Sequence, residues 1–365
     1  MISHLLKRFF IHIDSVLLAS IMFAMLVGLM VLYSASGQDF SRVNAQLINI
    51  TVALTAMWVV ANIPPQNIER IALPVYLTGL LLLVAVAIFG DISHGARRWL
   101  NIGITKIQPS ELMKLAAPIM LAWYFSKKES HPKIGDFLIA GLILAIPVLL
   151  IMKQPDLGTS MLVTASGFFV IFLAGLSWRF IIGGVALIGA LSPIFWHLLH
   201  DYQRRRILIL IDPTQDPLGS GYHIIQSTIA IGSGGLSGKG WLNGTQSQLD
   251  FLPERTTDFI FAVFGEEFGM IGNLLLLLLF TIIIARGFVI AGQAKSTFSR
   301  LLAGSITMTF FIYCFVNMGM VSGILPVVGV PLPLISYGGT SMLTLGLGFG
   351  LLMSIQTHKK LVATG

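Results

Sequence analysis

Charged side chains are scarce in this chain of 365 residues, of which 23 are Lys or Arg, 16 are Asp or Glu, and 11% in all are charged. A typical soluble domain carries about 25% charged residues. Hydrophobic residues instead make up 55% of the chain, and its mean hydropathy is +0.85. The shortage of charge excludes soluble two-domain enzymes, nucleic-acid-binding proteins and disordered scaffolds, and it indicates a membrane protein.

Cysteine and the common cofactor motifs are also missing. The single cysteine, Cys314, lies inside an apolar run, so no intrachain disulfide can form. No Cys and His residues have the spacing of a zinc site, and no glycine-rich motif has the strand-to-helix context of a nucleotide-binding loop. We therefore expect no organic cofactor and no ATP-driven pumping.

Long apolar runs are abundant, and they match the roughly 20 residues that a helix needs to cross a bilayer. We predict an all-α polytopic membrane protein, a single integral membrane domain over residues 1–365, with about ten transmembrane helices. The predicted spans centre near Phe23, Ala53, Leu82, Ala117, Leu144, Gly167, Leu187, Leu275, Phe310 and Leu347. The first run is too long for a signal peptide and is expected to remain as a span.

The placement of Lys and Arg predicts that both termini are cytoplasmic. With an even number of spans both ends lie on one side, and basic residues gather in the cytoplasmic loops of membrane proteins. Most basic residues of the short loops fall on the side of the termini, among them Lys7, Arg8, Arg70, Lys127, Lys128, Lys133, Lys359 and Lys360. The short loops of the other side hold Arg42, Arg97, Arg98, Lys106 and Lys153.

A long extracytoplasmic loop, residues 200–258, separates the seventh and eighth predicted spans. Its length exceeds what a connection needs and indicates a functional segment. Tyr222 to Ile231 has the pattern of a short amphipathic helix at the membrane surface. The side chains expected to face lipid are Ile224, Ile225, Ile229 and Ile231. The segment Gly232 to Gly240 is too rich in glycine to be rigid on its own.

The sharpest signal for a site inside the membrane is the pair Glu111 and Lys114 in the fourth predicted span. Three residues apart, the two side chains share one face of a helix. Each ionised group at mid-membrane costs about 2.5 to 3.5 kcal/mol on insertion scales, so such residues face a partner or a cavity. The pair either joins two helices as an ion pair or forms the polar wall of a cavity.

Further candidates lie at the outer ends of the predicted spans. Asp156 either caps the following helix or lines the cavity, and the two roles are compatible. Arg98, Arg204 and Arg206 stand at the outer surface. These arginines are either a solvated charge run or ligands of a lipid phosphate or pyrophosphate, which arginine binds with two parallel hydrogen bonds.

Asp258 ends the long loop directly before the eighth predicted span. One explanation is structural, since Thr256 or Thr257 would cap the helix and Asp258 would benefit from its dipole. The other is chemical, because a carboxylate at the membrane edge near arginines suits a general base or a metal ligand. Glu266 and Glu267, deeper in the span, are expected to pack against polar groups of other helices.

Several motifs together make the chain similar to the SEDS family (shape, elongation, division and sporulation). The longest is Asn317 followed by Gly323–Pro333 and Leu334–Ser341. The others occur in the same order as in the family and are Ala96–Trp99, Gln108–Glu111 with Lys114, Gln154–Gly158 and Pro253–Phe261. Tyr222–Ser227 and Gly238–Trp241 resemble the rod-elongation branch in particular.

This resemblance implies a ten-span enzyme of the bacterial cytoplasmic membrane, a peptidoglycan glycosyltransferase that polymerises lipid II on the outer face during cell elongation. It implies inversion at the anomeric carbon, release of polyprenyl pyrophosphate, and partnership with a class B penicillin-binding protein and other elongation-complex membrane proteins. The family's essential acid matches Asp258, as general base or as ligand of Mg²⁺ or Mn²⁺. Arg98, Arg204 and Arg206 would hold the pyrophosphate, and Glu111, Lys114 and Asp156 would line the cavity.

Three alternatives stay open at this point. A lipid II flippase would also place polar groups within spans, but it should present them at both membrane faces, whereas the candidates here gather at one. A scaffold without chemistry needs small residues and close packing more than buried charge. The division-specific FtsW branch is the near alternative within the family, and its members often carry a longer cytoplasmic N-terminus.

Overall fold

The computed structural model describes residues 12–93, 96–101, 106–128, 132–199, 201–216, 219–249, 251–252 and 254–358, and it is mostly helical. The helices are α2 (Ser15–Ala35), α3 (Phe40–Ala61), α4 (Pro65–Arg70), α5 (Ala72–Phe89), α6 (Pro109–Ser126), α7 (Ile134–Met152), α8 (Leu157–Leu173), α9 (Trp178–Leu198), α10 (Asp201–Ile211), the 3-10 helix η1 (Pro213–Gln215), α11 (Ser220–Ser233), α12 (Thr245–Gln248), α13 (Ile260–Gln293), α14 (Thr297–Val321) and α15 (Gly339–Thr357). A small antiparallel sheet has the order β1 (Asp91–Ser93), β2 (Ala96–Asn101) and β3 (Lys106–Ile107).

Membrane-crossing helices dominate the fold. The described residues include seven helices that are long and apolar enough to span a bilayer, namely α2, α3, α5, α7, α13, α14 and α15. Shorter apolar helices occur in α8 and α9, and α6 carries the charged pair. Each predicted span centre lies within one of these helices. The multi-pass helical architecture is therefore confirmed, while the count of ten spans and the sidedness of the loops remain predictions.

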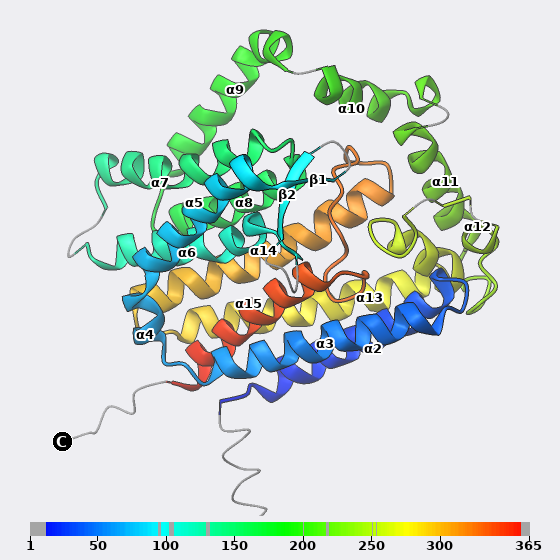
Figure 1. Ribbon diagram of the computed structural model, residues 1–365, viewed down its shortest axis with the longest axis horizontal. Coiled ribbons are helices and arrows are strands. Elements are labelled where there is room, and N and C mark those ends of the chain that lie inside the picture. Colours follow the sequence, from blue (N-terminus) through cyan, green and yellow to red (C-terminus); the bar gives the residue numbers. More distant parts are fainter. Residues whose placement is uncertain are drawn as a thin grey trace, which may run out of the picture.

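The spans pack side by side around α14. Figure 1 shows α2, α3, α13, α14, α15 and α6 running along the same direction, with α4 at one end of the bundle and α11 and α12 at the other. In α14 67% of the apolar stretch that would cross the membrane is buried inside the protein, compared with 22% in α3 and in α7. Side chains such as Leu81 and Phe89 face outward, as expected of a lipid-facing surface.

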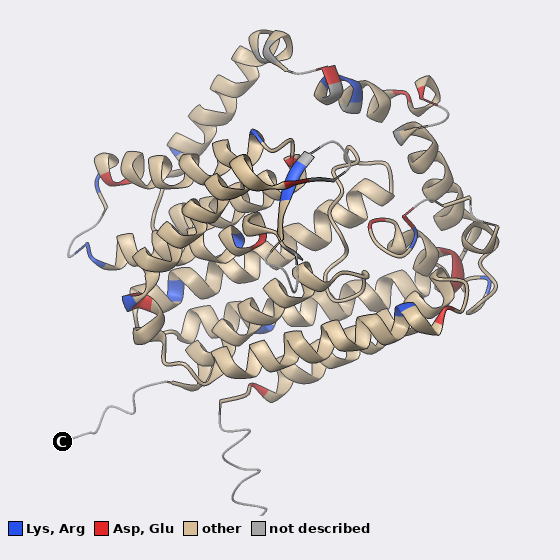
Figure 2. Cartoon of the chain, in the orientation of Figure 1, with Lys and Arg blue, Asp and Glu red and all other residues tan. Residues whose placement is uncertain are grey.

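Charged side chains lie mainly in loops and at helix ends, and most of the helix length carries none (Figure 2). This distribution follows from the cost of placing charge in hydrocarbon. Acidic residues also gather at the end of the bundle that carries α11 and α12 (Figure 2). We call it the Asp258 end, because Asp258 lies just before α13, whose first turns contact α12.

The long loop is ordered into short helices rather than being one irregular connection. The predicted helix from Tyr222 to Ile231 is present within α11. The expectation that Ile224 faces lipid is wrong, because its side chain is 4% exposed, whereas Ile229 is 45% exposed. The reason is that α11 packs against α13, and Ser227 Oγ donates a hydrogen bond to the Val321 carbonyl of α14 at 2.8 Å.

Candidate active site

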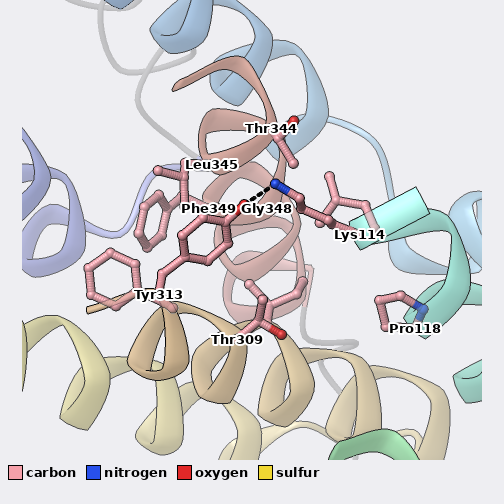
Figure 3. Close-up of a pocket in the computed structure, with 11 residues that line it drawn as sticks. Lys114, Pro118, Thr309, Tyr313, Thr344, Leu345, Gly348 and Phe349 are labelled. Carbon is pink, nitrogen blue, oxygen red and sulfur yellow. Dashed lines mark hydrogen bonds between the residues drawn. The ribbon is translucent and has the colours of Figure 1, made fainter. Parts of the chain in front are cut away.

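The charged pair in α6 is real and buried. Pro109 occupies the first turn of α6 and Glu111 follows in the same turn, where the helix dipole favours an acid. Lys114 Nζ lies 2.5 Å from Glu111 Oε1, and the two residues are 4% and 8% exposed. Lys114 Nζ also donates to the Tyr313 hydroxyl of α14, as Figure 3 shows. The pair therefore joins α6 to α14.

A small cavity lies beside Lys114, between α6, α14 and α15 (Figure 3). Its walls are mostly apolar, and the polar lining residues are Lys114, Tyr313, Thr309 and Thr344. Its volume of about 30 Å³ admits a water molecule but not a sugar ring. The prediction that Glu111 and Lys114 wall a substrate-sized hollow gains no support from this cavity.

Asp156 caps α8 and connects it to α6. Its Oδ1 accepts a hydrogen bond from the Thr159 amide at 3.2 Å, as an N-cap residue does. Its Oδ2 accepts from Gln108 Nε2 at 3.0 Å, directly before α6 begins. The predicted cap is thus present, and Asp156 orders the entrance to both helices.

Arg98 of β2 lies beside this junction. Its Nη2 donates to the Pro155 carbonyl at 2.5 Å, and its buried Nε has no hydrogen-bond partner within the described part of the chain. A buried donor without a partner is costly. Arg98 therefore retains hydrogen-bonding capacity next to Asp156.

Asp258 sits in the turn Glu254–Phe259 that leads into α13. Its backbone carbonyl accepts from Asn317 Nδ2 of α14 at 2.8 Å, and the same amide nitrogen donates to the Val330 carbonyl at 2.7 Å. Gly329 faces the carboxylate, since a Cβ added at that glycine would lie 3.4 Å from Asp258 Oδ2. Asn317 thus fastens Asp258 to the loop between α14 and α15.

Burial and the nearby Glu254 carboxylate raise the pKa of Asp258 to about 6. A carboxyl group with a pKa near the working pH is suited to proton transfer, because it is mostly ionised at pH 7 and still basic enough to accept a proton. Glu254 itself accepts a hydrogen bond from Thr257 Oγ1 at 2.9 Å. The turn therefore presents two neighbouring carboxylates of different exposure.

The central helix α14 brings the charged pair and Asp258 together. Tyr313, which touches Lys114, and Asn317, which touches Asp258, are four residues apart. They share one helix face about 6 Å apart along the axis. Glu111, Lys114 and Asp258 are therefore joined through successive turns of one buried helix.

Arg204 is not brought to this group. Its Nε donates to the Trp196 carbonyl at 2.8 Å and its Nη2 to the His197 carbonyl at 2.6 Å, so the guanidinium caps α9 as cations do at helix C-termini. In Figure 1, α9 and α10 project away from the bundle. The side chain of Arg206 lies outside the described residues.

Three contributors were not among the predicted site residues, although Asn317 begins the longest family motif. Arg42 of α3 donates from Nη1 to Thr256 Oγ1 at 3.1 Å, two residues from Asp258. Tyr313 and Asn317 are 3% and 0% exposed. A signal existed for Asn317, because an amide within an apolar helix needs partners, but its partners are distant in the sequence.

A divalent cation would find few ligands at this site. Among the described residues no group of three His, Cys, Asp or Glu side chains is arranged to hold a metal ion. Asp258 and Glu254 supply at most two carboxylates. That number fits the way Mg²⁺ is bound by one or two carboxylates together with substrate phosphates, and it does not fit a cage built by protein alone.

Comparison with known proteins shows similarity over nearly the whole chain. Residues 14–361 match the family model for FtsW, RodA and SpoVE, described as cell cycle protein. The chain is 52% identical over 354 residues to peptidoglycan glycosyltransferase MrdB of Escherichia coli, which covers 97% of this chain and 96% of the relative. It is 36% identical over 346 residues to a probable peptidoglycan glycosyltransferase FtsW of Geobacter metallireducens, with 91% and 92% covered.

Solved structures agree with the sequence comparison. A chain from a study of the structural coordination of polymerization and crosslinking by a peptidoglycan synthase complex matches with a TM-score of 0.82 and 32% identity, covering 94% of this chain and 97% of that one. The crystal structure of the rod shape determining protein RodA of Thermus thermophilus matches with a TM-score of 0.71 and 27% identity, covering 94% and 96%. The chain therefore belongs to the FtsW, RodA and SpoVE family of cell cycle proteins, as its resemblance to the SEDS family predicted.

Proposed function

We propose that this protein is a peptidoglycan glycosyltransferase of the rod-elongation branch, which polymerises lipid II into glycan strands. The observation that carries the proposal is the 52% identity to MrdB over 97% of the chain. The lower identity of 36% to an FtsW favours the elongation branch over the division branch. The location of Asp258, next to Gly329 and held by Asn317, supplies a carboxylate for the chemistry.

In the proposed reaction Asp258 acts as general base. The 4-hydroxyl of the acceptor sugar attacks the anomeric carbon of the donor, a C–O bond forms there, and the bond to the diphosphate breaks. Asp258 receives the hydroxyl proton as the bond forms, and polyprenyl pyrophosphate leaves. A single displacement inverts the α-linked donor into a β-1,4 linkage. The elevated pKa of Asp258, about 6, suits this transfer at neutral pH.

Arg98 is our primary candidate for binding the diphosphate. Its buried Nε lacks a partner within the part of the chain that the structure describes, and guanidinium groups match phosphate oxygens in geometry. Arg204 would join it only if α10 moved toward the bundle, because its guanidinium now caps α9, and Arg206 on the same helix is proposed on the same condition. Glu111, Lys114 and Asp156 are proposed to hold the helices that carry the site in place, through their contacts among α6, α8 and α14.

A divalent cation, Mg²⁺ or Mn²⁺, fits beside Asp258 only together with the diphosphate, because Asp258 and Glu254 supply at most two carboxylate ligands. Bound there it would neutralise charge on the leaving diphosphate. Asp258 and Glu254 are the residues that would hold it.

The proposed topology has about ten spans with both termini in the cytoplasm and the Asp258 end at the outer face of the bacterial inner membrane. The similarity to a chain of a peptidoglycan synthase complex that coordinates polymerization and crosslinking supports a class B penicillin-binding protein as partner, with other elongation-complex membrane proteins beside it.

The test is polymerisation of purified lipid II, with the products separated on a gel. We expect polymer from the wild type and a loss of at least about 100-fold in rate from Asp258→Ala, the range that general base catalysis contributes. Asp212→Asn is the control, since this acid of the same loop accepts hydrogen bonds from Thr214 and Gln215 of its own turn and its replacement should leave the rate unchanged. Polymer from Asp258→Ala at the wild-type rate would remove Asp258 from its role.

A lipid II flippase is a less favoured alternative. The cavity beside Lys114 measures about 30 Å³ and offers no passage for a disaccharide headgroup. Protection of fluorescent lipid II from dithionite in proteoliposomes discriminates, because our proposal predicts no flipping above that of protein-free vesicles.

A further inference from the structure

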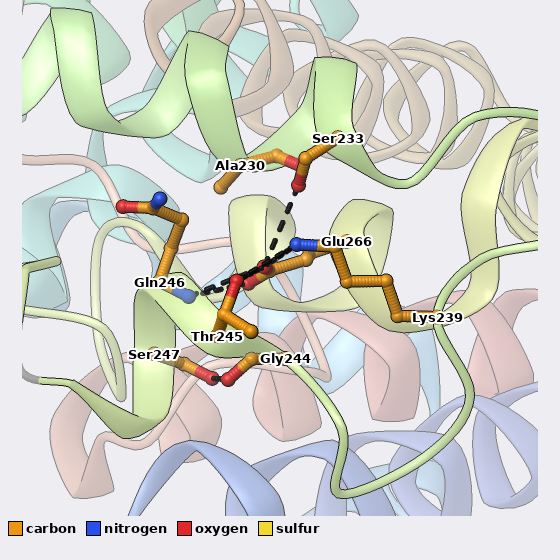
Figure 4. A network of polar contacts seen from close by, with 8 residues as sticks. All are labelled: Ala230, Ser233, Lys239, Gly244, Thr245, Gln246, Ser247 and Glu266. Carbon is orange, nitrogen blue, oxygen red and sulfur yellow. Dashed lines mark hydrogen bonds and ion pairs between the residues drawn. The ribbon is translucent and has the colours of Figure 1, made fainter.

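Glu266, in the second turn of α13, carries a buried carboxylate that holds separate pieces of the long loop (Figure 4). The residue is 0% exposed. Its Oε1 accepts from Lys239 Nζ at 2.7 Å, from Thr245 Oγ1 at 3.0 Å and from the Gln246 amide at 3.1 Å. A buried carboxylate is tolerated only when it is paired and hydrogen-bonded. Within the described part of the chain, the Glu266 carboxylate accepts its hydrogen bonds from groups of the loop.

The glycine-rich segment of the loop docks on α13 at the same place. Gly269 has φ of 64° inside α13, and the helical ladder is broken there. The freed groups pair with the loop, since the Lys239 amide donates to the Glu266 carbonyl at 3.0 Å and the Met270 amide donates to the Gly235 carbonyl at 2.9 Å. A Cβ on Gly238 would meet the Glu267 carbonyl at 2.1 Å. The segment that is too flexible on its own is thus fixed by contact with α13.

The short helix α12 connects Glu266 to the turn that bears Asp258. Thr245 and Gln246, which bind Glu266, are the first residues of α12. Arg255 Nη1 donates to the Ser247 carbonyl of the same helix, and Arg255 stands three residues before Asp258. The far side of the turn is held separately, by Ser336 Oγ donating to the Thr257 carbonyl at 2.6 Å.

We propose that Glu266 is a positioning residue for Asp258, acting through Lys239, α12 and Arg255 to set the location of the catalytic carboxylate. The inference rests on the proposed function. Asn317 and Ser336 fix the turn from the side of α14 and α15, and the Glu266 contacts fix it from the side of the loop. Loss of the Glu266 charge frees α12 while the spans stay packed.

The role of Glu266 as a hub for several donors distinguishes it from an ordinary ion pair. Exchanging the two partners, as Lys239→Glu with Glu266→Lys, would restore an ion pair but would point an ammonium at the Gln246 amide, which needs an acceptor. We therefore expect the exchanged double variant to remain as impaired as Glu266→Gln. Recovery of the wild-type rate by the exchange would contradict the claim that Glu266 is needed as the acceptor for several donors.

The primary experiment measures kcat and KM for lipid II polymerisation by the full-length protein in detergent. Glu266→Gln should lower kcat about tenfold or more, because misplacing a catalytic group by about 1 Å has large effects, while KM stays within about twofold. Asp14→Asn is the matched control. Like Glu266→Gln, it neutralises a buried acid that is paired with a basic residue. Asp14 Oδ2 lies 2.5 Å from Nη2 of Arg286, which belongs to the opposite end of α13 from Glu266.

Asp14→Asn is expected to lower the melting temperature and to leave kcat unchanged. Equal loss of kcat in both variants, or wild-type kcat in Glu266→Gln, overturns the proposal. If the wild type itself makes no polymer, the proposed function fails; if the wild type and Glu266→Gln polymerise alike, the positioning role alone fails.

A second measurement covers the case in which Glu266→Gln does not fold. Thr245→Val removes one donor from an exposed position without leaving a buried charge, and it should lower kcat severalfold. Arg255→Met breaks the contact with α12. If Arg255 carries the effect, Thr245→Val combined with Arg255→Met loses less than the product of the two single losses. Multiplicative losses, or wild-type kcat in Thr245→Val, refute the proposed route.

Discussion

Glu111 and Lys114 neutralise each other in a place that water barely reaches. Lys114 has Tyr313 as a second partner, whereas Glu111 Oε2 is buried without a hydrogen-bond partner among the described residues. The ion pair itself lies within α6, and the hydrogen bond from Lys114 to Tyr313 connects it to α14. Its spacing of three residues was sufficient to predict the ion pair, but not the tyrosine on a helix almost two hundred residues away.

Removing one member of this pair should cost much more than removing both. Lys114→Met leaves an unpaired buried carboxylate and should lower the free energy of unfolding by about 3 to 5 kcal/mol. Adding Glu111→Gln should recover much of that loss. Thermal melting in detergent measures both. A double variant no more stable than Lys114→Met would show that the cost lies elsewhere, for example in the lost contact with Tyr313.

Gly329 offers a test of the surroundings of Asp258. Its φ is +74°, so Gly329→Ala costs about 1 kcal/mol in backbone strain and also places a methyl group against the carboxylate. Gly175, with φ of +105° and no atom within 4 Å of an added Cβ, is the matched control. We expect similar stability losses in Gly329→Ala and Gly175→Ala, but a slower polymerisation rate only in Gly329→Ala. Equal rates would place the site away from Gly329.

The raised pKa of Asp258, about 6, predicts the direction of the pH dependence. The carboxylate is the active base, so kcat/KM should fall tenfold per pH unit below about pH 6. Glu254→Gln removes the neighbouring charge and should shift that limb to lower pH. Because the folded-state pKa lies above the unfolded value, Asp258 stabilises the fold below about pH 4 and loses this contribution as the pH rises through 6. An unchanged acid limb in Glu254→Gln would contradict this assignment.

Among the helices, α11 shows where sequence patterns reach their limit. Its amphipathic pattern predicted a helix correctly, but the assignment of Ile224 to lipid was wrong, because periodicity shows which residues share a face and not what that face meets. The bundle itself supplies an apolar surface in α13 and α14. Likewise, the capping role of Asp156 follows from local sequence. Which groups Arg204 binds depends instead on the angle between α9 and α10.

The packing of α11 can be tested with two isoleucines of one helix. Ile224→Ala should lower the free energy of unfolding by about 2 to 4 kcal/mol, as expected for a buried large-to-small substitution. Ile229→Ala, at an exposed position, should change it by less than about 0.5 kcal/mol. Equal losses in thermal melts would mean that α11 does not rest on the bundle as described.

In the molecule as a whole, chemistry is concentrated at one end of a bundle that is otherwise apolar. Composition and apolar run lengths were enough to predict a helical multi-pass protein, and irregular motifs identified its family. The assembly of the site was not predictable, because Asp258, Asn317, Gly329 and Arg42 meet only through packing of distant segments. The same holds for Glu266, whose partners Lys239, Thr245 and Gln246 lie 20 to 27 residues before it in the chain.

The central claim is that Asp258 accepts the proton of the attacking hydroxyl at the Asp258 end of the bundle. A structure of the protein with a lipid-linked donor and an acceptor glycan bound tests it most directly. We predict that the acceptor 4-hydroxyl lies within about 2.6 to 3.2 Å of an Asp258 carboxylate oxygen, with the diphosphate beside Arg98. A hydroxyl placed well outside hydrogen-bonding reach of Asp258, next to some other carboxylate, would contradict the account.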